Sequence, residues 1–353
     1  MGQKKLMKGN EALAEAMILA GCDAYFGYPI TPQSEVLEYL AIHATKRTGM
    51  VVLQAESEVS AINMIYGAAG AGKRVMTTSS SPGISLMQEG ISYIAGAELP
   101  CVLANVNRGG PGLGTIQPAQ GDYFQSVKGG GHGDYHLLVL APNSVQEMVD
   151  FVKLGFELAE KYRNPVMLLT DGAIGQMMEK VELFPQMERI DRHFPWATTG
   201  KPKDGERRFI TSLHIESELF EKINLHIQAK YKQMEEEEVR YQTTNIEDAE
   251  YIFTGFGLGS RICSKAMQLG REKGYKIGLV RPQTLFPFPK KIFAELAPRI
   301  KGILDVEMNA GQMVEDVRLS VEGKTRVEFY GRMGGVIPSP DEILEHFEKT
   351  FIK

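Results

Sequence analysis

Three short segments of this 353-residue chain combine polar or ionisable side chains with the features of ligand-binding loops. They cover residues 28–35, 56–61 and 105–112. Each comes directly after an apolar run that predicts a strand, and each leads into a predicted helix or a glycine-rich loop. Because ligands of parallel α/β sheets collect where the strands end, we expect the chemistry of the protein in these segments.

The first segment contains the sequence Tyr28-Pro29-Ile30-Thr31-Pro32. Pro32 fits the first position of a helix, which makes Thr31 the capping residue, whose side-chain oxygen accepts a backbone N–H. A helix start also carries unpaired N–H groups and a partial positive charge. An exposed Thr31 hydroxyl beside it could therefore hold a carboxylate or a carbonyl oxygen of a ligand. The residues alone leave both roles open.

The second and third segments supply ionisable groups. Glu58 is predicted in the first turn of a helix rich in Ala, Ile, Met and Gly, and Glu56 is the less favoured acid. An acid beside so apolar a surface needs a partner, unless it stays at the surface and favours the positive end of the helix. Arg108 ends a strand and enters a glycine loop, where its guanidinium could grip a carboxylate or form a structural ion pair.

Residues 1–185 are predicted to form an α/β domain that positions these segments. The apolar runs that predict buried strands are 23–29, 50–56, 74–80, 99–107, 136–142 and 164–171. The predicted helices between them are 11–20, 33–47, 58–71, 83–97 and 144–162. Such alternation is typical of a parallel sheet covered on both faces. We also expect the turn 79–83 and the loop 129–133 at the ligand-binding edge, with His132 as a weak catalytic candidate.

The rest of the chain divides in two. Residues 186–247 are predicted to be a linker with one long charged helix, in which the acidic run 235–238 fits a solvated face. A second, smaller α/β domain is predicted over residues 248–353. Its expected strands are 251–256, 276–282, 302–309 and 326–331.

Composition excludes several classes of protein. With 43% hydrophobic and 24% charged residues the chain is neither disordered nor fibrous, and its net charge of −5 argues against nucleic-acid binding. The sequence has no apolar run of about 18 residues, so we predict no membrane span. It also has no signal-peptide pattern, so we predict no secretion. Its three cysteines are scattered, so we expect no iron–sulfur cluster or zinc site in this chain, and a cytoplasmic location.

Two glycine patterns resemble nucleotide-binding loops. Residues 67–73 fit GxxxxGK, but Arg74 stands where a phosphate-binding loop needs Ser or Thr, so a helix end is favoured. Residues 255–259 resemble a dinucleotide-binding turn, but the next strand ends at 279–282 without an acid for the ribose. A tight packing turn is the favoured interpretation here, and an NAD-dependent dehydrogenase is the weaker alternative.

Taken together, the segments resemble the α subunit of the thiamine-diphosphate-dependent 2-oxoacid:ferredoxin oxidoreductases. The resemblance covers nearly the whole chain and rests on GYPITPQSE, the helix from Glu58 to Gly67-Ala68, TSSSPGISLMQEG and NVNRGGPG, and on VRPQTLFPFP and VEMNAGQMVED in the second domain. It implies a pyrimidine-binding α/β domain with a parallel sheet, followed by a smaller transketolase C-terminal-like α/β domain.

The resemblance also implies residue roles. The family glutamate that bonds N1′ of the aminopyrimidine precedes a Gly-Ala pair by nine positions, which selects Glu58 and not Glu56. Thr31 and Arg108 match the family's substrate-binding threonine and arginine, so Glu58, Thr31 and Arg108 are the expected catalytic residues. The expected cofactor-binding residues are Pro29, which would present its backbone, with Ile30, Glu58, Ser81, Pro82 and Gly83.

The family motif for the diphosphate and Mg²⁺ is missing, since Gly121-Asp122-Tyr123 does not match it. We therefore expect no metal site in this chain, and a β subunit that brings the diphosphate and Mg²⁺ site. The resemblance further implies a γ subunit and a small ferredoxin-like subunit, with [4Fe-4S] clusters confined to partner subunits.

The implied activity is the CoA-dependent oxidative decarboxylation of a 2-oxoacid to acyl-CoA and CO₂, with ferredoxin as the electron acceptor. Two segments, KGNEALAEAMILAGCDAYFGYPITPQSE and KGGGHGDYHLLVLAP, most resemble the branched-chain (3-methyl-2-oxobutanoate) enzymes, and the 2-oxoglutarate enzymes are the near alternative. No residue can be assigned to a distal substrate carboxylate. A non-catalytic assembly subunit is the alternative from another class.

Overall fold

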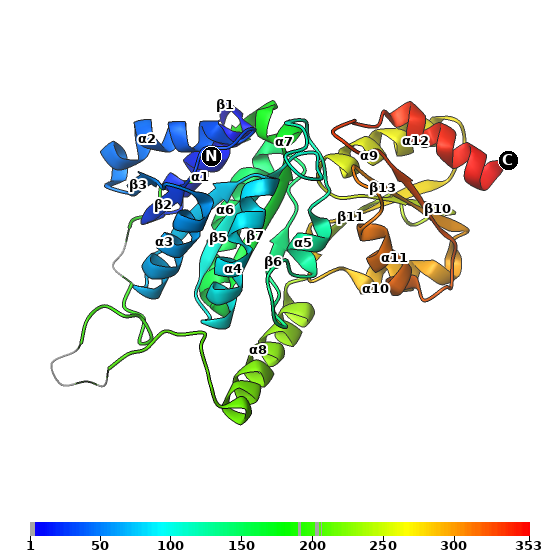
Figure 1. Cartoon of the computed structure of the whole chain (residues 1–353). Coiled ribbons are helices and arrows are strands. Elements are labelled where there is room, and N and C mark those ends of the chain that lie inside the picture. The colour runs from blue at the N-terminus through cyan, green and yellow to red at the C-terminus, as the bar shows by residue number, and fades with distance from the viewer. Residues whose placement is uncertain (1–3, 190–191, 202–204, 206) are drawn as a thin grey trace.

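The computed structural model describes residues 4–189, 192–201, 205 and 207–353. Two α/β units lie side by side, the first in blue to green and the second in yellow to red (Figure 1). The helix α8 (Ser217–Glu237) leads from one to the other. Among the described residues, no helix is long and apolar enough to cross a membrane.

The first unit is built on a seven-stranded sheet with the order β12-β6-β7-β5-β4-β2-β3. All neighbouring strands are parallel except the last to join, β12, which runs antiparallel to β6. The strands are β2 (Ala24–Gly27), β3 (Val51–Gln54), β4 (Val75–Ser79), β5 (Cys101–Asn107), β6 (Leu138–Leu140), β7 (Pro165–Asp171) and β12 (Thr284–Phe286). Every residue of β4, β5, β6 and β7 is buried, which explains their continuous apolar runs.

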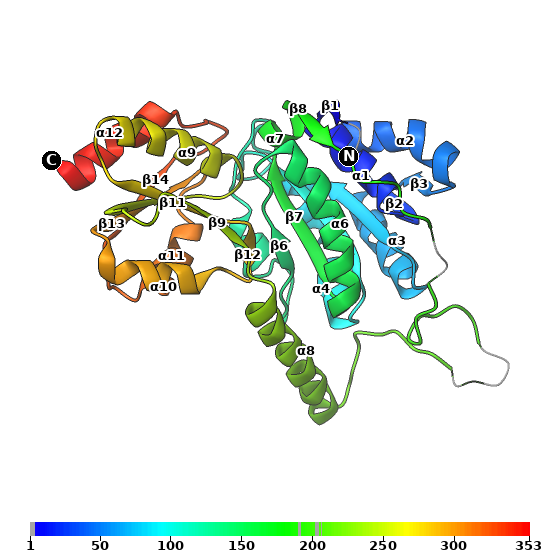
Figure 2. The ribbon, with the colours of Figure 1, turned by 180° about the vertical axis from the view of Figure 1, so that it is seen from behind.

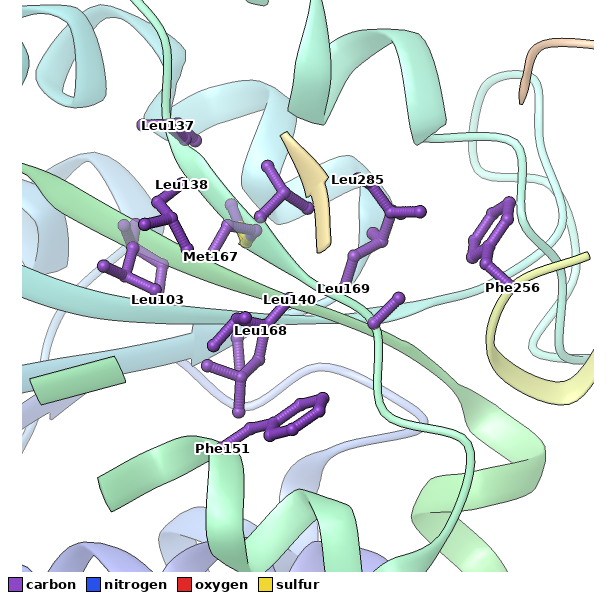
Figure 3. Close-up of a cluster of buried hydrophobic side chains, with 14 of the residues drawn as sticks. Leu103, Leu137, Leu138, Leu140, Phe151, Met167, Leu168, Leu169, Phe256 and Leu285 are labelled. Atoms are coloured by element: carbon purple, nitrogen blue, oxygen red, sulfur yellow. The ribbon is translucent and has the colours of Figure 1, made fainter. Parts of the chain in front are cut away.

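Helices cover both faces of this sheet. Figure 1 shows α3 and α4 side by side on the near face, and Figure 2 shows α1 and α6 on the opposite one. The helices of the unit are α1 (Gly9–Leu19), α2 (Ser34–Thr48), α3 (Glu58–Gly70), α4 (Ser81–Gly96), α5 (Tyr123–Val127), α6 (Val145–Tyr162) and α7 (Gly172–Gln176). The core between sheet and helices is aliphatic, as the leucines around Met167 and Phe151 show (Figure 3). Its burial supplies the main stabilisation of the unit.

The second unit has a five-stranded sheet with the order β14-β13-β10-β11-β9, in which only β9 is antiparallel to its neighbour. Its strands are β9 (Tyr241–Thr244), β10 (Tyr251–Thr254), β11 (Ile277–Pro282), β13 (Gly302–Glu307) and β14 (Val327–Gly331). Its helices are α9 (Gly257–Glu272), α10 (Lys290–Leu296), α11 (Met313–Val321) and α12 (Pro340–Phe347). The helices α9 and α12 lie on one face and α10 and α11 on the other (Figure 2).

Four short strands escaped the sequence analysis. β1 (Lys4–Lys8) pairs with β8 (Met178–Glu182) in a separate antiparallel pair. β9 lies in the stretch 186–247, where only a helix was predicted, and joins the second sheet. β12 follows the second unit's strand β11, yet pairs with β6 of the first unit. Each is short, lies at an edge and lacks a run of apolar residues, so no periodicity marks it.

Candidate active site

The loops after four adjacent strands meet at one edge of the first sheet. The strands β3, β2, β4 and β5 are parallel neighbours, so their carboxyl ends point the same way. Thr31 follows β2, Glu58 follows β3, Ser81 follows β4 and Arg108 follows β5. The structure therefore gathers the predicted site residues at the edge where α/β proteins bind ligands.

Glu58 is the first residue of α3, and Ser57 caps the helix by accepting the N–H of Ser60 at 3.2 Å. Its side chain is 5% exposed, whereas Glu56 is exposed to solvent. Within the described residues, no hydrogen bond or ion pair joins the Glu58 carboxylate to another group. The alternative of a surface acid is therefore excluded: Glu58 is buried, and its carboxylate has no partner among the described residues.

Gly83 makes room for this carboxylate. A Cβ atom at Gly83 would lie 2.5 Å from Oε1 of Glu58 and 2.1 Å from Oγ of Ser79, both too close for any side chain. The first turn of α4 and the start of α3 therefore meet at Gly83, with an acid and a hydroxyl beside the same backbone.

Unused hydroxyls line the start of α4. Ser79 and Ser80 are completely buried, and neither hydroxyl has a hydrogen-bond partner in the described part of the chain. Ser81 is engaged, since its Oγ accepts the N–H of Arg108 at 3.1 Å. Buried hydroxyls without partners are costly, so this end of the strand is held at an energetic cost. The polar run 77–81, which spans the end of β4 and the start of α4, was the sequence signal for these hydroxyls.

Thr31 does not cap α2, so that prediction is wrong. The helix begins at Ser34 with Gln33 as the preceding residue. The physical reason is that the Pro32 carbonyl is taken by Nδ2 of Asn10 at 2.7 Å, while the N–H of Val36 turns to Gln33 at 3.0 Å. The Thr31 side chain is exposed and makes no hydrogen bond within the described residues. It is free for the second predicted role, ligand binding.

Arg108 pairs with backbone carbonyls and not with an acid. It is 8% exposed; Nη1 donates to the Thr31 carbonyl at 2.9 Å and Nη2 to the Leu113 carbonyl at 3.0 Å. The structural ion pair considered as an alternative is therefore absent within the described residues. A guanidinium has five N–H donors, so Arg108 keeps others, and its Nε is buried without a partner.

The loop 129–133 does not lie at this edge, contrary to expectation. It runs beside α4, where a Cβ at Gly131 would lie 2.7 Å from the Gln88 carbonyl. His132 lines a cavity of about 420 Å³ together with Tyr93 and α8. The reason is topological: β6 is parallel to β7, so the loop that precedes β6 must return towards the amino ends of the strands.

The two glycine patterns serve packing. The pattern 67–73 ends α3, as predicted. In the turn 255–259, the side chain of Gln120 fills the space beside the glycines: its Nε2 donates to the Phe256 carbonyl at 2.7 Å, and a Cβ at Gly259 would lie 3.2 Å from its Oε1. A residue of the first unit thus occupies the place that a dinucleotide would need, which argues against the dehydrogenase alternative.

A cavity of about 450 Å³ lies between the two units, next to Ser81 and Pro82. The glycine loop after Arg108 forms one wall, and Asn309 and Gln312 of the second unit form another. Asp122 also lines it; burial raises the pKa of this carboxyl, although Asn105 donates to it at 2.8 Å. Sequence reasoning missed these lining residues because only the packing of the two units brings them together.

In the part of the chain that the structure describes, no three His, Cys, Asp or Glu side chains lie close enough to hold a metal ion.

Two family models match the chain. Residues 15–250 match the model described as pyruvate flavodoxin/ferredoxin oxidoreductase, thiamine diphosphate-binding, and residues 249–343 match pyruvate:ferredoxin oxidoreductase core domain II.

Among curated proteins, the chain is 49% identical to ketoisovalerate oxidoreductase subunit VorB of Methanothermobacter thermautotrophicus, covering 98% of this chain and 97% of the relative. It is 35% identical to 2-oxoglutarate synthase subunit KorA of Methanocaldococcus jannaschii, covering 96% and 98%.

Among solved structures, 2-oxoglutarate:ferredoxin oxidoreductase from Magnetococcus marinus, with 2-oxoglutarate, coenzyme A and succinyl-CoA bound, aligns with a TM-score of 0.87 and 27% identity. The alignment covers 99% of this chain but 65% of that longer one. A split-gene transketolase, an inactive tetramer, aligns over 98% of both chains with a TM-score of 0.62 and 12% identity, a likeness of fold alone. The fold class predicted from the sequence is confirmed.

Proposed function

Because the chain belongs to the thiamine-diphosphate-dependent 2-oxoacid:ferredoxin oxidoreductase family, we propose that it is the subunit that binds the pyrimidine half of the cofactor. The reaction of the assembled enzyme is the CoA-dependent oxidative decarboxylation of a 2-oxoacid to acyl-CoA and CO₂, with reduction of ferredoxin. The observation that carries the proposal is the buried, unpartnered carboxylate of Glu58 at the ligand-binding edge of the sheet.

The residues at this edge fit the pyrimidine end of thiamine diphosphate. Glu58 offers a shielded acceptor for N1′, Gly83 leaves space beside it, and Pro29 and Ile30 present an accessible backbone. Ser81 and Pro82 border the same start of α4. We assign the diphosphate and Mg²⁺ to a partner subunit because the chain lacks the family motif that binds them, and Gly121-Asp122-Tyr123 does not match it.

When bound, thiamine diphosphate supplies a nucleophilic ring carbon and accepts the electrons released as CO₂ leaves. Glu58 holds a proton between its carboxylate and N1′, and its burial strengthens this interaction because water does not screen it. Thr31 and Arg108 orient the carboxylate and the 2-carbonyl of the substrate, and such positioning can supply several kcal/mol. The bond from Arg108 to the Thr31 backbone keeps these two residues together.

For the substrate we propose 3-methyl-2-oxobutanoate. The support is the higher identity to the ketoisovalerate subunit, 49%, than to the 2-oxoglutarate subunit, 35%, over nearly the whole chain in both cases. 2-Oxoglutarate is the second candidate, favoured by the alignment with a structure that holds it.

The face formed by α3 and α4 is the surface we assign to the subunit that brings the diphosphate and Mg²⁺. Val59 and Met64 of α3 and Leu86 of α4 are 43%, 37% and 55% exposed, and they flank the helix starts that hold Glu58 and Gly83. Figure 1 shows these two helices side by side on the near face of the sheet. Covering this face would close the site from the side that the chain leaves open.

The remaining partners are a γ subunit and a small ferredoxin-like subunit, with the [4Fe-4S] clusters in partner chains, CoA as cosubstrate and ferredoxin as acceptor. We also propose a cytoplasmic location, which fits three buried cysteines that are all free thiols.

The test is Glu58→Gln in the assembled complex, with Glu56→Gln as the matched control. The first substitution should lower kcat for 3-methyl-2-oxobutanoate by about 100-fold or more, since it removes a group that acts on a proton, while assembly by gel filtration stays unchanged. The control should keep wild-type turnover. Retained turnover in Glu58→Gln would contradict the proposal and favour a non-catalytic assembly subunit.

A further inference from the structure

A buried chain of hydrogen bonds lies behind the loop 28–31. The hydroxyl of Tyr25 is 2.8 Å from Oγ1 of Thr78, which donates to Oε1 of Gln33 at 2.6 Å. Nε2 of Gln33 then donates to the backbone carbonyl of Tyr28 at 3.3 Å. The side chains of Tyr25, Thr78 and Gln33 are completely buried. None of these three residues has a part in the function proposed above.

The chemistry of the groups gives the chain one direction. An amide oxygen only accepts, so the single O–H of Thr78 must point to Gln33, and Thr78 must accept from Tyr25. The amide nitrogen of Gln33 is thereby left for the Tyr28 carbonyl. Burial raises the pKa of Tyr25 to about 12, so its hydroxyl stays protonated and the chain stays intact at neutral pH.

The chain connects the two loops that border the proposed cofactor site. Tyr25 lies in β2 and Gln33 precedes α2, so both flank the loop 28–31. Thr78 lies in β4, directly before Ser79 and the turn that contacts Glu58. Gly27 adjoins the chain, because a Cβ there would lie 2.4 Å from the Tyr25 hydroxyl.

The loop is consequently held at both ends. Gln33 holds the Tyr28 carbonyl at its start, and Arg108 holds the Thr31 carbonyl at its end, at 2.9 Å. Between these anchors lie Pro29, which is exposed, and Ile30, which is partly exposed.

We propose that Tyr25, Thr78 and Gln33 are positioning residues that hold the backbone of the loop 28–31 where it receives the aminopyrimidine ring. This inference rests on the proposed function. It predicts that breaking this chain of hydrogen bonds weakens cofactor binding before it affects folding. Without these bonds the loop must become ordered when the cofactor binds, and the entropy that this costs lowers the affinity.

The experiment measures the binding of thiamine diphosphate with Mg²⁺ to the cofactor-free assembled complex by calorimetry, and the KM and kcat for the 2-oxoacid. Thr78→Val keeps the shape of the side chain but removes its hydroxyl, so Kd should rise about tenfold. Thr78→Ser restores the hydroxyl and should return Kd close to the wild-type value. Tyr39→Phe is the matched control, since its hydroxyl bonds Glu15 at 3.0 Å, outside this chain of bonds, and its Kd should not change.

An unchanged Kd in Thr78→Val would overturn the inference, as would failure of Thr78→Ser to restore binding. A fall in the melting temperature with unchanged Kd and KM would show a purely structural role and also overturn it. If Thr78→Val does not assemble, Gln33→Met removes the amide that holds the Tyr28 carbonyl, and wild-type affinity in that variant would also overturn the inference. The proposed function is tested separately by Glu58→Gln, so either idea can fail alone.

Discussion

Asp171 is a buried acid at the carboxyl end of a strand of the first sheet. It ends β7 and caps α7, its Oδ1 accepting the N–H groups of Ala173 and Ile174 at 2.9 and 3.1 Å. Its Oδ2 is buried without a hydrogen-bond partner among the described residues. Burial raises the pKa of Asp171 to about 6, and the backbone N–H groups oppose this only in part.

The folded protein therefore holds the Asp171 proton more tightly than the unfolded chain, whose pKa is about 3.9. The stability that this proton confers is complete below about pH 4 and is lost as the pH rises to about 6, by up to about 3 kcal/mol. Asp171→Asn keeps the capping oxygen but does not titrate. Between pH 4 and 7, the free energy of unfolding of the variant should rise relative to that of the wild type by this amount. Urea unfolding at several pH values measures the difference. Parallel pH profiles would contradict this.

The sequence predicts the surroundings of some site residues better than those of others. Residue type and spacing selected Glu58 over Glu56, and burial separates the two in the same sense. The cap at Thr31 was wrong because a side chain on another helix, Asn10, takes the carbonyl that the helix would need. No local pattern reports such long-range competition, and none reports that Gln33 is turned inward.

At the scale of elements, the site depends on the close approach of α3 and α4 at their amino ends. Gly83→Ala would place a methyl group 2.1 Å from Ser79 and 2.5 Å from Glu58, so one of them must move. We expect about 1–3 kcal/mol of lost stability and at least a tenfold weaker binding of thiamine diphosphate.

Gly155→Ala in α6 is the control for Gly83→Ala. A Cβ there meets only ordinary contacts of 3.4–3.5 Å, and alanine favours a helix interior, so stability and cofactor binding should be kept or improved. Urea unfolding and calorimetry measure both effects. Normal cofactor affinity in Gly83→Ala would contradict the proposed place of the ring beside this turn.

The long, buried or amphipathic elements could be predicted from the sequence, because their apolar periodicity is strong. The strands β1, β8, β9 and β12 could not, since edge strands of three to five residues leave too few positions for a pattern. β12 also pairs across the two units, a partnership that depends on how they pack. The course of the loop 129–133 was missed because it depends on the direction of β6, which runs parallel to β7.

At the scale of the whole molecule, Gln120 joins the two units. Its side chain binds the Phe256 carbonyl at 2.7 Å and the Met308 N–H at 3.0 Å, and its own backbone carbonyl accepts from Asn309 at 2.8 Å. Arg281 and Glu147 add an ion pair between the units at 2.6 Å. The contacts of Gln120 hold the second unit against the loop that follows Arg108, so they keep the site's outer wall in place.

Gln120→Ala should destabilise the protein by about 2–4 kcal/mol, because it leaves a buried carbonyl and a buried N–H unpaired. Gln233→Ala, which removes an exposed side chain on α8 bonded, among the described residues, only to Glu237, should cost less than about 0.5 kcal/mol. Urea unfolding measures the difference. Equal stability of the two variants would show that Gln120 does not hold the units together.

The most direct test measures how fast the cofactor loses its C2 proton. In the assembled complex with thiamine diphosphate and Mg²⁺ bound, the rate at which the C2 proton of the cofactor exchanges with deuterium can be measured by quench and NMR. If Glu58 acts at N1′, exchange in Glu58→Gln should be slower than in the wild type by about 100-fold, while Glu56→Gln exchanges at the wild-type rate. Equal rates in all three proteins would contradict the role of Glu58.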